Sequence, residues 1–105
     1  MFLFNKKSNN TIKVNDIDEV LGKINLIDIR EPYEYTFGHI PTAKNIPMNT
    51  VLSNTEKYLD KNQEYYIVCQ SGGRSSATCK ILSDKGYNVI NVLGGTGSYR
   101  GKLDR

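Results

Sequence analysis

The sequence has no tryptophan, a single histidine and only two cysteines. Cys69 and Cys79 are too few for the disulfide framework that small secreted domains use in place of a large core. No Cys-x-x-Cys pair occurs, and the lone His39 does not complete a set of zinc ligands. We therefore expect neither a metal site nor a fold that depends on disulfides.

Long apolar runs and dense charge clusters are also missing. Residues 1–4 are apolar but too short for a signal peptide, and no window approaches a membrane span. The net charge of +3 comes from scattered lysines rather than a basic block, which argues against a nucleic-acid partner. We expect a soluble, cytoplasmic monomer without membrane or nucleic-acid partners, although residues 1–4 offer an apolar surface to a second chain.

What is present is the composition of an ordinary globular domain, with 38% apolar and 24% charged residues. At 105 residues the chain is long enough for one modest core, and no linker, repeat or low-complexity segment divides it. Residues 1–105 are therefore expected to form one domain, with its core at about residues 12–100.

Segments typical of strands and of helices alternate along this chain. Strands are predicted at residues 11–14, 24–29, 44–48, 64–69 and 87–93. Helices are predicted at residues 15–22, 32–38, 49–60 and 75–86, with a turn or one more helical turn after residue 93. The alternation predicts an α/β domain with a small, mainly parallel five-stranded sheet flanked by helices.

A thiol stands where the strand at residues 64–69 gives way to a glycine-rich turn. After Cys69, Gly72 and Gly73 permit positive φ angles and close backbone approach, so successive amides can point into one small cavity. The helix that follows adds partial positive charge at its start, and a neighbouring arginine adds more. Such a thiol has a lowered pKa and is a candidate nucleophile. The residues of this loop are Gln70, Ser71, Gly72, Gly73, Arg74 and Ser75.

The length of the loop bears on its chemistry. Cysteine-dependent phosphatases use Cys-x5-Arg followed by Ser or Thr, which is wide enough for a phosphate. Here only four residues separate Cys69 from Arg74, and the smaller loop suits one atom added to the sulfur. The plainer alternative for Cys69 is a buried structural cysteine. Cys79, one turn into the predicted helix, is expected to fill the core rather than to react.

Two long segments resemble the signatures of the rhodanese family of sulfurtransferases. INLIDIREPYEYTFGHIPTAKNIPM resembles the first signature and IVCQSGGRSSATCKILSDKGYNVINVLGG the second, so the resemblance covers about residues 12–100. Tyr99 stands where the family often has tryptophan, and it keeps an aromatic core role. Gln70, Ser71 and Gly73 are uncharged, whereas members that use thiosulfate well often carry basic residues there.

The resemblance implies a rhodanese-like fold and a two-step sulfur transfer. The Cys69 thiolate would take a sulfur from thiosulfate or a persulfide donor, and the amides of residues 70–75 would stabilise the resulting persulfide. A thiophilic acceptor would then remove that sulfur: cyanide in an assay, a thiol or a partner protein in the cell. The intermediate is a covalent cysteine persulfide, so no metal or organic cofactor is required.

Asp28 and Arg30 match the Asp-x-Arg element of the same family. Alternate residues of a strand share a face, so both side chains could reach the loop side of the sheet. Asp28 is expected to accept hydrogen bonds from nearby backbone, and Arg30 to pair with an acid or to meet the donor anion. Alternatively, both only tie down loops. Glu31 and Glu34 are candidate partners for Arg74, or simple helix N-terminal charges.

Two further polar residues are expected to be structural. His39 lies in the GHIP turn, and a persulfide transfer from an ionised thiol needs no general base. Ser75 is expected to cap the helix that follows the loop, with its hydroxyl near the sulfur.

Three functions other than direct catalysis of sulfur transfer stay open. The uncharged loop slightly favours a sulfur-relay partner that carries persulfide and has little thiosulfate activity. A regulatory binding module would keep the fold without catalysis, but the intact Cys69 argues against it. Phosphatase or arsenate-reductase activity is disfavoured because the loop is one residue short.

Overall fold

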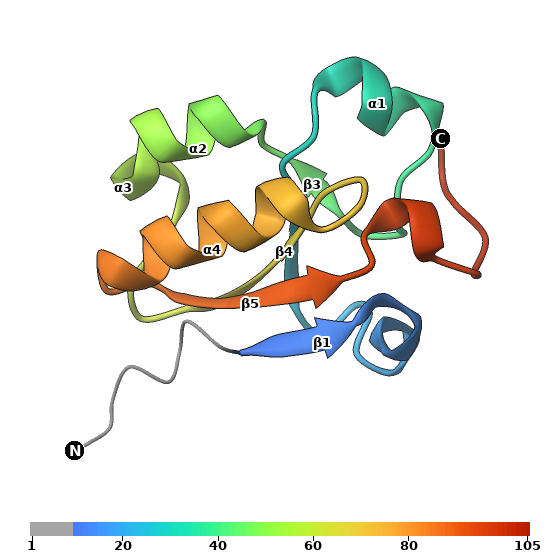
Figure 1. The fold of residues 1–105 in the computed structure, drawn as a ribbon, viewed down its shortest axis with the longest axis horizontal. Coiled ribbons are helices and arrows are strands. Elements are labelled where there is room, and N and C mark those ends of the chain that lie inside the picture. The colour runs from blue at the N-terminus through green and yellow to red at the C-terminus, as the bar shows by residue number, and fades with distance from the viewer. Residues whose placement is uncertain (1–9) are drawn as a thin grey trace.

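The computed structural model describes residues 10–105 and contains one parallel five-stranded sheet (Figure 1). Its strand order is β1-β5-β4-β2-β3, and every neighbouring pair is parallel. The strands are β1 (Thr11–Lys13), β2 (Asn25–Asp28), β3 (Lys44–Asn45), β4 (Glu64–Val68) and β5 (Asn88–Leu93). The helices are η2 (Val14–Glu19), α1 (Pro32–Phe37), α2 (Met48–Ser53), α3 (Thr55–Tyr58), α4 (Gly73–Asp84) and η3 (Thr96–Ser98). The predicted α/β architecture with a parallel five-stranded sheet is confirmed.

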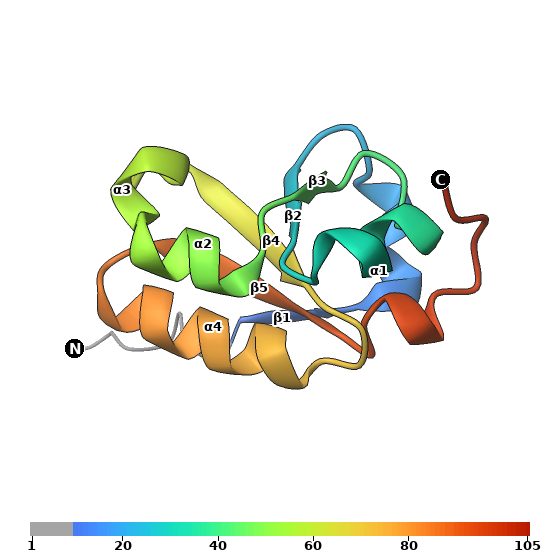
Figure 2. The ribbon, with the colours of Figure 1, turned by 90° about the horizontal axis from the view of Figure 1, so that it is seen from above.

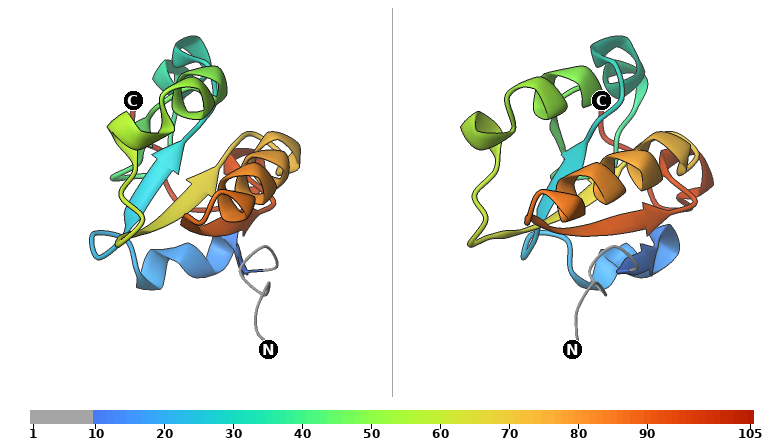
Figure 3. Two further views of the ribbon diagram at one scale, coloured as in Figure 1. Left: turned by 90° about the vertical axis from the view of Figure 1, so that its left-hand side faces the viewer. Right: turned by 60° about the vertical axis from the view of Figure 1, so that its left-hand side comes forward.

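Helices cover both faces of the sheet, and an apolar core lies under each face. Helices α2, α3 and α4 lie on one side, whereas the 3-10 helix η2 lies on the other (Figures 2 and 3). Neighbouring residues of β4 belong to different cores: Ile67 packs toward the first side and Val68 toward the second. Because alternate strand residues share a face, Cys69 points to the same side as Ile67, where α4 packs.

Several element boundaries differ from the sequence prediction. The helix predicted over residues 49–60 is divided at Asn54, whose φ of −136° is not helical. The Thr55 hydroxyl donates to the carbonyl of Val51 at 2.8 Å, so a side-chain group forms a hydrogen bond with a backbone carbonyl of the helix. The helix predicted over residues 15–22 is the shorter 3-10 helix η2. The third strand is shorter than predicted and covers only Lys44–Asn45, although the amides of Ile46 and Met48 still donate to the carbonyls of Asp28 and Ile29. Pro47, between them, leads directly into α2.

No helix within residues 10–105 combines the length and the hydropathy that crossing a membrane requires. The apolar tail at residues 1–4, considered above as a surface for a second chain, lies outside the described residues.

The turn after β5 supports the loop after β4. The amide of Thr96 donates to the carbonyl of Cys69 at 2.8 Å, and the amide of Gly97 donates to the carbonyl of Gln70 at 2.9 Å. Gly95 precedes this pair with φ +68°, and a Cβ added there would collide with the Gln70 carbonyl. Only glycine therefore lets the two turns pack this closely.

Replacing Gly95 with alanine is expected to destabilise the fold more than the same change at Gly22. Gly22 also has a positive φ, +86°, but no atom lies within 4 Å of an added Cβ. Gly22→Ala should therefore cost only backbone strain, about 1 kcal/mol. Gly95→Ala adds the collision with Gln70 and should cost clearly more. Urea unfolding of both variants measures the difference, and equal losses of stability would contradict this packing.

Candidate active site

The Cys69 sulfur is held by a set of hydrogen-bonding groups that we call the sulfur cradle: the amides of Gly72 and Ser75 and the Ser75 hydroxyl. Cys69 follows the end of β4 and is only 1% exposed. The amides of Gly72 and Ser75 donate to Sγ at 3.1 and 3.3 Å. Ser75 Oγ lies 3.4 Å from Sγ and donates to the Gly72 carbonyl at 3.2 Å. The expected arrangement of loop amides around the thiol is therefore present.

Glycine builds this cradle by starting α4 early. Gly72 is the N-cap of α4 and has φ +110°, a left-handed conformation that glycine adopts at low cost. The helix consequently begins at Gly73, two residues before the position predicted for it. The prediction that Ser75 caps the helix is wrong, because Ser75 already lies in the first turn. Its amide and hydroxyl both face the sulfur instead.

The sulfur cradle changes the acidity of Cys69. Burial by itself would raise the pKa of the thiol, since it disfavours the charged thiolate. Hydrogen bonding with the Ser75 side chain and hydrogen bonds from the amides of Ser75, Gly72 and Ser71 outweigh burial and lower the pKa below its usual value. The nearby start of α4 adds partial positive charge in the same direction. Cys69 is thus a buried thiol whose surroundings favour the thiolate.

Cys79 has the opposite environment. It is buried in the core beneath α4, in the same apolar cluster as Cys69, and both thiols are free. Burial, and to a lesser degree the negative charge of Cys69, raises the pKa of Cys79 to about 12. Its packing agrees with the prediction of a core residue, and a protonated, enclosed thiol is a poor nucleophile.

Asp28 and Arg30 form a buried ion pair on the other side of the sheet from Cys69. Asp28 accepts hydrogen bonds from the amide of Arg30 and from its guanidinium at 2.9–3.1 Å. The same guanidinium donates to Gln70 Oε1 at 2.9 Å and to the carbonyl of Gly38 at 2.8 Å. Of the two roles expected for Arg30, the structure has the pairing with an acid. Arg30 reaches the loop through Gln70 and makes no hydrogen bond to the sulfur.

Arg74 is paired with helix α1 across the mouth of the loop. Its guanidinium donates to both carboxylate oxygens of Glu34 at 2.9 Å, and Glu34 also accepts a hydrogen bond from the amide of Glu31. The hydrogen bond from Arg74 is the main cause that lowers the pKa of Glu34 to about 2. Glu34 therefore compensates the positive charge that Arg74 was expected to bring to the loop.

The six predicted loop residues consequently divide by role. Gly72 and Ser75 contact the sulfur, the Ser71 amide helps to lower its pKa, and Gly73 opens α4. The side chains of Gln70 and Arg74 turn outward, to Arg30 and Glu34 respectively.

His39 and Tyr99 have structural environments. The ring of His39 stacks on Tyr35 with centroids 3.7 Å apart, and its Nδ1 lies 3.0 Å from the Tyr35 carbonyl. The backbone of His39 pairs with that of Asp104. Tyr99 packs against the second core and donates to Asp18 at 2.6 Å, so it keeps the aromatic packing expected at its position.

From the sequence alone, no supporting role was expected for the turn of Gly95, Thr96 and Gly97. In the structure, the amides of Thr96 and Gly97 donate to the backbone carbonyls of Cys69 and Gln70. The double glycine after the last predicted strand was the available signal. Its significance depends on the fact that β5 lies beside β4, and the strand order cannot be read from local sequence.

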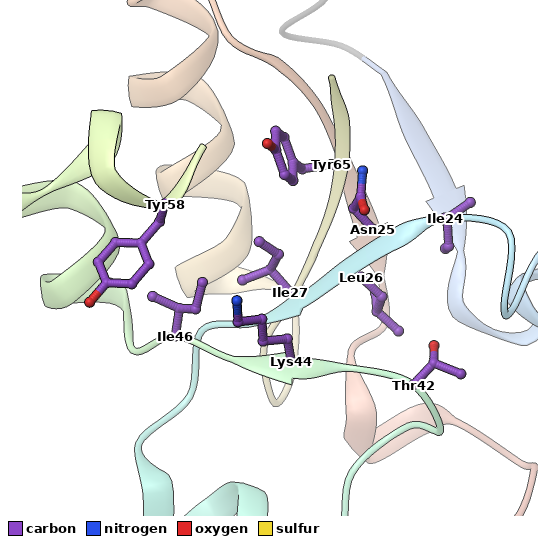
Figure 4. A pocket seen from close by; sticks show the side chains of 9 residues that line it. All are labelled: Ile24, Asn25, Leu26, Ile27, Thr42, Lys44, Ile46, Tyr58 and Tyr65. Carbon is purple, nitrogen blue, oxygen red and sulfur yellow. The ribbon is translucent and has the colours of Figure 1, made fainter. Parts of the chain in front are cut away.

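Two pockets lie near opposite ends of the strands. One, of about 290 Å³, adjoins the Cys69 loop and is lined by Arg30, Glu34, Phe37, Gln70, Thr96 and Tyr99 among others. The other, of about 320 Å³, is lined by Asn25, Lys44, Tyr58 and Tyr65 among others (Figure 4). Asn25 and Tyr65 stand at the amino ends of β2 and β4, so this second pocket lies away from Cys69. Within residues 10–105, no group of three His, Cys, Asp or Glu side chains is placed to hold a metal ion.

Known proteins share this fold and these motifs. The family model of the rhodanese-like domain matches residues 13–102. The Bacillus subtilis protein "Putative sulfurtransferase YtwF" is 36% identical over 96 residues, which are 91% of this chain and 92% of that protein. "Putative sulfur carrier protein YrkF" of the same organism is 38% identical over 90 residues, which are 85% of this chain but 46% of YrkF. The crystal structure of SSP1007 from Staphylococcus saprophyticus has a TM-score of 0.81 at 35% identity, covering 91% of this chain and 99% of SSP1007.

The matched range includes every part of the site. Residues 13–102 contain the Asp28–Arg30 pair, the loop of residues 69–75 and the supporting turn at residues 95–97. The agreement extends over nearly the full length of two of the compared proteins rather than one short motif. The chain therefore belongs to the rhodanese-like domain family.

Proposed function

We propose that this protein is a sulfurtransferase in which Cys69 carries the transferred sulfur as a persulfide. The observation that supports the proposal best is the sulfur cradle, in which two amides and one hydroxyl converge on Sγ. A similar protein whose name describes a sulfurtransferase supports the reaction class. We place this activity in the cytoplasm, in a monomer that needs no metal or organic cofactor.

The proposed first step loads the sulfur. The Cys69 thiolate attacks the outer sulfur of thiosulfate or of a persulfide, forming a new S–S bond. The S–S bond of the donor breaks, and its electron pair leaves on sulfite or on a thiolate. The cradle favours this step because it stabilises the attacking thiolate without a general base.

The proposed second step releases the sulfur to an acceptor. A thiol in the cell, or cyanide in an assay, attacks the outer sulfur, and the electron pair of the broken bond returns to Cys69 as a thiolate. The loop amides can stabilise the persulfide between the two steps. The first amides of a helix have no partner within it, so those of Gly73 and Arg74 are candidates to interact with the added sulfur atom.

A sulfur-relay role is the second candidate, and one observation favours it. The side chains at Gln70 and Ser71 are uncharged, and both Arg30 and Arg74 are already paired with acids. A similar protein, YrkF, is named as a sulfur carrier, although this chain covers about half of it. A binding module without catalysis is less well supported, because it would not need the thiolate that the cradle favours.

Loading of Cys69 can be measured directly as a change in mass. Wild-type protein and Cys79→Ser are expected to gain one sulfur atom from thiosulfate or a cysteine persulfide and to lose it to cyanide. Cys69→Ser is expected to do neither, whereas Cys79→Ser serves as a matched control for thiol removal. Intact-mass spectrometry reads out all three proteins. If Cys69→Ser still gains a sulfur that cyanide removes, or the wild type gains none from either donor, the proposal is wrong.

The size of the loop provides an independent test. One glycine inserted between Gly72 and Gly73 would separate the amides that now meet at Sγ. The loss of one hydrogen bond to a charged atom costs about 1.5–3 kcal/mol, or roughly ten- to a hundredfold in rate. Sulfur transfer should fall by that amount, whereas a glycine inserted between Asn62 and Gln63 in an exposed turn should have little effect. Unchanged or faster transfer after the first insertion would contradict the role of the cradle.

A further inference from the structure

Helix α1 exposes two aromatic side chains beside the active site. None of its six residues is buried, and Tyr33 and Phe37 are 69% and 79% exposed. They are four residues apart, so they lie on the same face of the helix. Exposed aromatic pairs of this kind are uncommon on a surface that contacts only water.

Polar contacts hold both ends of this helix, and between them Tyr35 packs against the second core. Glu31 and Glu34 form a reciprocal capping box at its start, and Arg74 binds Glu34 through two hydrogen bonds. At its end, the Arg105 guanidinium donates to the carbonyl of Phe37 at 3.0 Å. Tyr35 packs against the second core, whereas Tyr33 and Phe37 stay exposed on a helix that is fixed in place.

The aromatic face of α1 is continuous with the pocket at the Cys69 loop. Tyr33 and Phe37 line a shallow apolar hollow, and Phe37 also lines the loop pocket together with Gln70. Glu34 of the same helix binds Arg74 at the far end of the loop. Helix α1 therefore lies against both ends of the loop. Figure 2 shows it near the start of α4.

The charges of the two arginines that contact the loop are compensated. Within the described residues, Arg30 is paired with Asp28 and Arg74 with Glu34, so neither guanidinium offers an unbalanced charge to a small dianion. The pocket instead offers neutral groups, among them the buried Thr96 hydroxyl, which has no hydrogen-bond partner within the described residues. Neutral polar groups beside exposed aromatic rings complement an uncharged peptide better than a charged small molecule.

We propose that the Tyr33–Phe37 face of α1 docks a partner protein whose reacting cysteine is flanked by apolar, uncharged residues. The proposal rests on the proposed function, because the docked cysteine exchanges sulfur with Cys69. Its apolar neighbours cover Tyr33 and Phe37, while its backbone meets the polar groups of the loop pocket. Aromatic anchors commonly supply much of the binding energy of such interfaces.

The transfer to this partner is balanced without an oxidant. The partner thiol first loses its proton to solvent, and its thiolate attacks the outer sulfur of the Cys69 persulfide. One S–S bond forms on the partner and one breaks at Cys69, which receives the electron pair as a thiolate. Loading of Cys69 from a partner persulfide is the reverse of this exchange.

Two short peptides test the proposal on the full chain. Both are uncharged and contain one central cysteine, which is flanked by leucine and phenylalanine in the first peptide and by serines in the second. Protein loaded with sulfur, as verified by intact mass, is mixed with each peptide, and the loss of the sulfur is followed in time. The apolar peptide should react about tenfold faster with the wild type, because burying an aromatic side chain is worth at least that much.

The variant Tyr33→Ser should lose this preference while its transfer to 2-mercaptoethanol stays unchanged, because Tyr33 lines the apolar hollow but not the loop pocket. Ile81→Ser is the matched control, because Ile81 is 39% exposed on α4 and lines none of the pockets at the loop. An unchanged melting temperature is expected for Tyr33→Ser, since Tyr33 is 69% exposed.

The outcomes separate this proposal from the proposed function. If Cys69 does not load with sulfur, the proposed function itself fails. If Cys69 loads and transfers to 2-mercaptoethanol but treats the two peptides alike, only the docking proposal is overturned. A wild-type dimer in sedimentation analysis that Tyr33→Ser dissociates would also overturn it, because the occupant of the face would then be a second copy.

Discussion

The hydrogen bonds from backbone amides to the Cys69 sulfur are the interaction on which the rest of the site depends. They require a glycine with positive φ at residue 72 and a helix that begins at the next residue, so that the Ser75 amide also meets Sγ. They also decide the competition between burial, which favours the neutral thiol, and hydrogen bonding, which favours the thiolate. A buried cysteine without these donors would be as inert as Cys79 in the core beside it.

The remainder of the fold keeps this loop in position from three directions. The turn of residues 95–97 holds its backbone through two amide hydrogen bonds. The buried Arg30, itself fixed by Asp28, binds Gln70 on the face opposite the sulfur. Arg74 and Glu34 connect the other end of the loop to α1. The arginines therefore act as supports, and in both cases an acid compensates their charge. These two arginines therefore add no net charge beside the two exposed aromatic rings.

Local sequence was sufficient for the strand, the glycine turn, the nucleophile and the order of helices and strands, because each depends on neighbouring residues. It was insufficient for contacts between distant segments. The pairing of Arg74 with Glu34 spans 40 residues, and Glu31 was an equal candidate until the structure was known. The support from Gly95 depends on β5 lying beside β4. The start of α4 was predicted too late because Ser75 looks like a helix cap. The positive φ of Gly72 instead lets the helix begin at Gly73, two residues earlier in the chain.

Measuring the pKa of the Cys69 thiol tests most directly whether the sulfur cradle favours the thiolate. This pKa can be obtained in the Cys79→Ser background from the pH dependence of thiolate absorbance and of the alkylation rate, with Cys69→Ser as the blank. The account predicts a pKa below the ordinary thiol value of about 8.5. The midpoint of the alkylation rate should therefore lie below that value, and Ser75→Ala should move the midpoint upward. A midpoint at or above the ordinary value would mean that burial dominates, and the sulfur cradle would not explain the reactivity of Cys69.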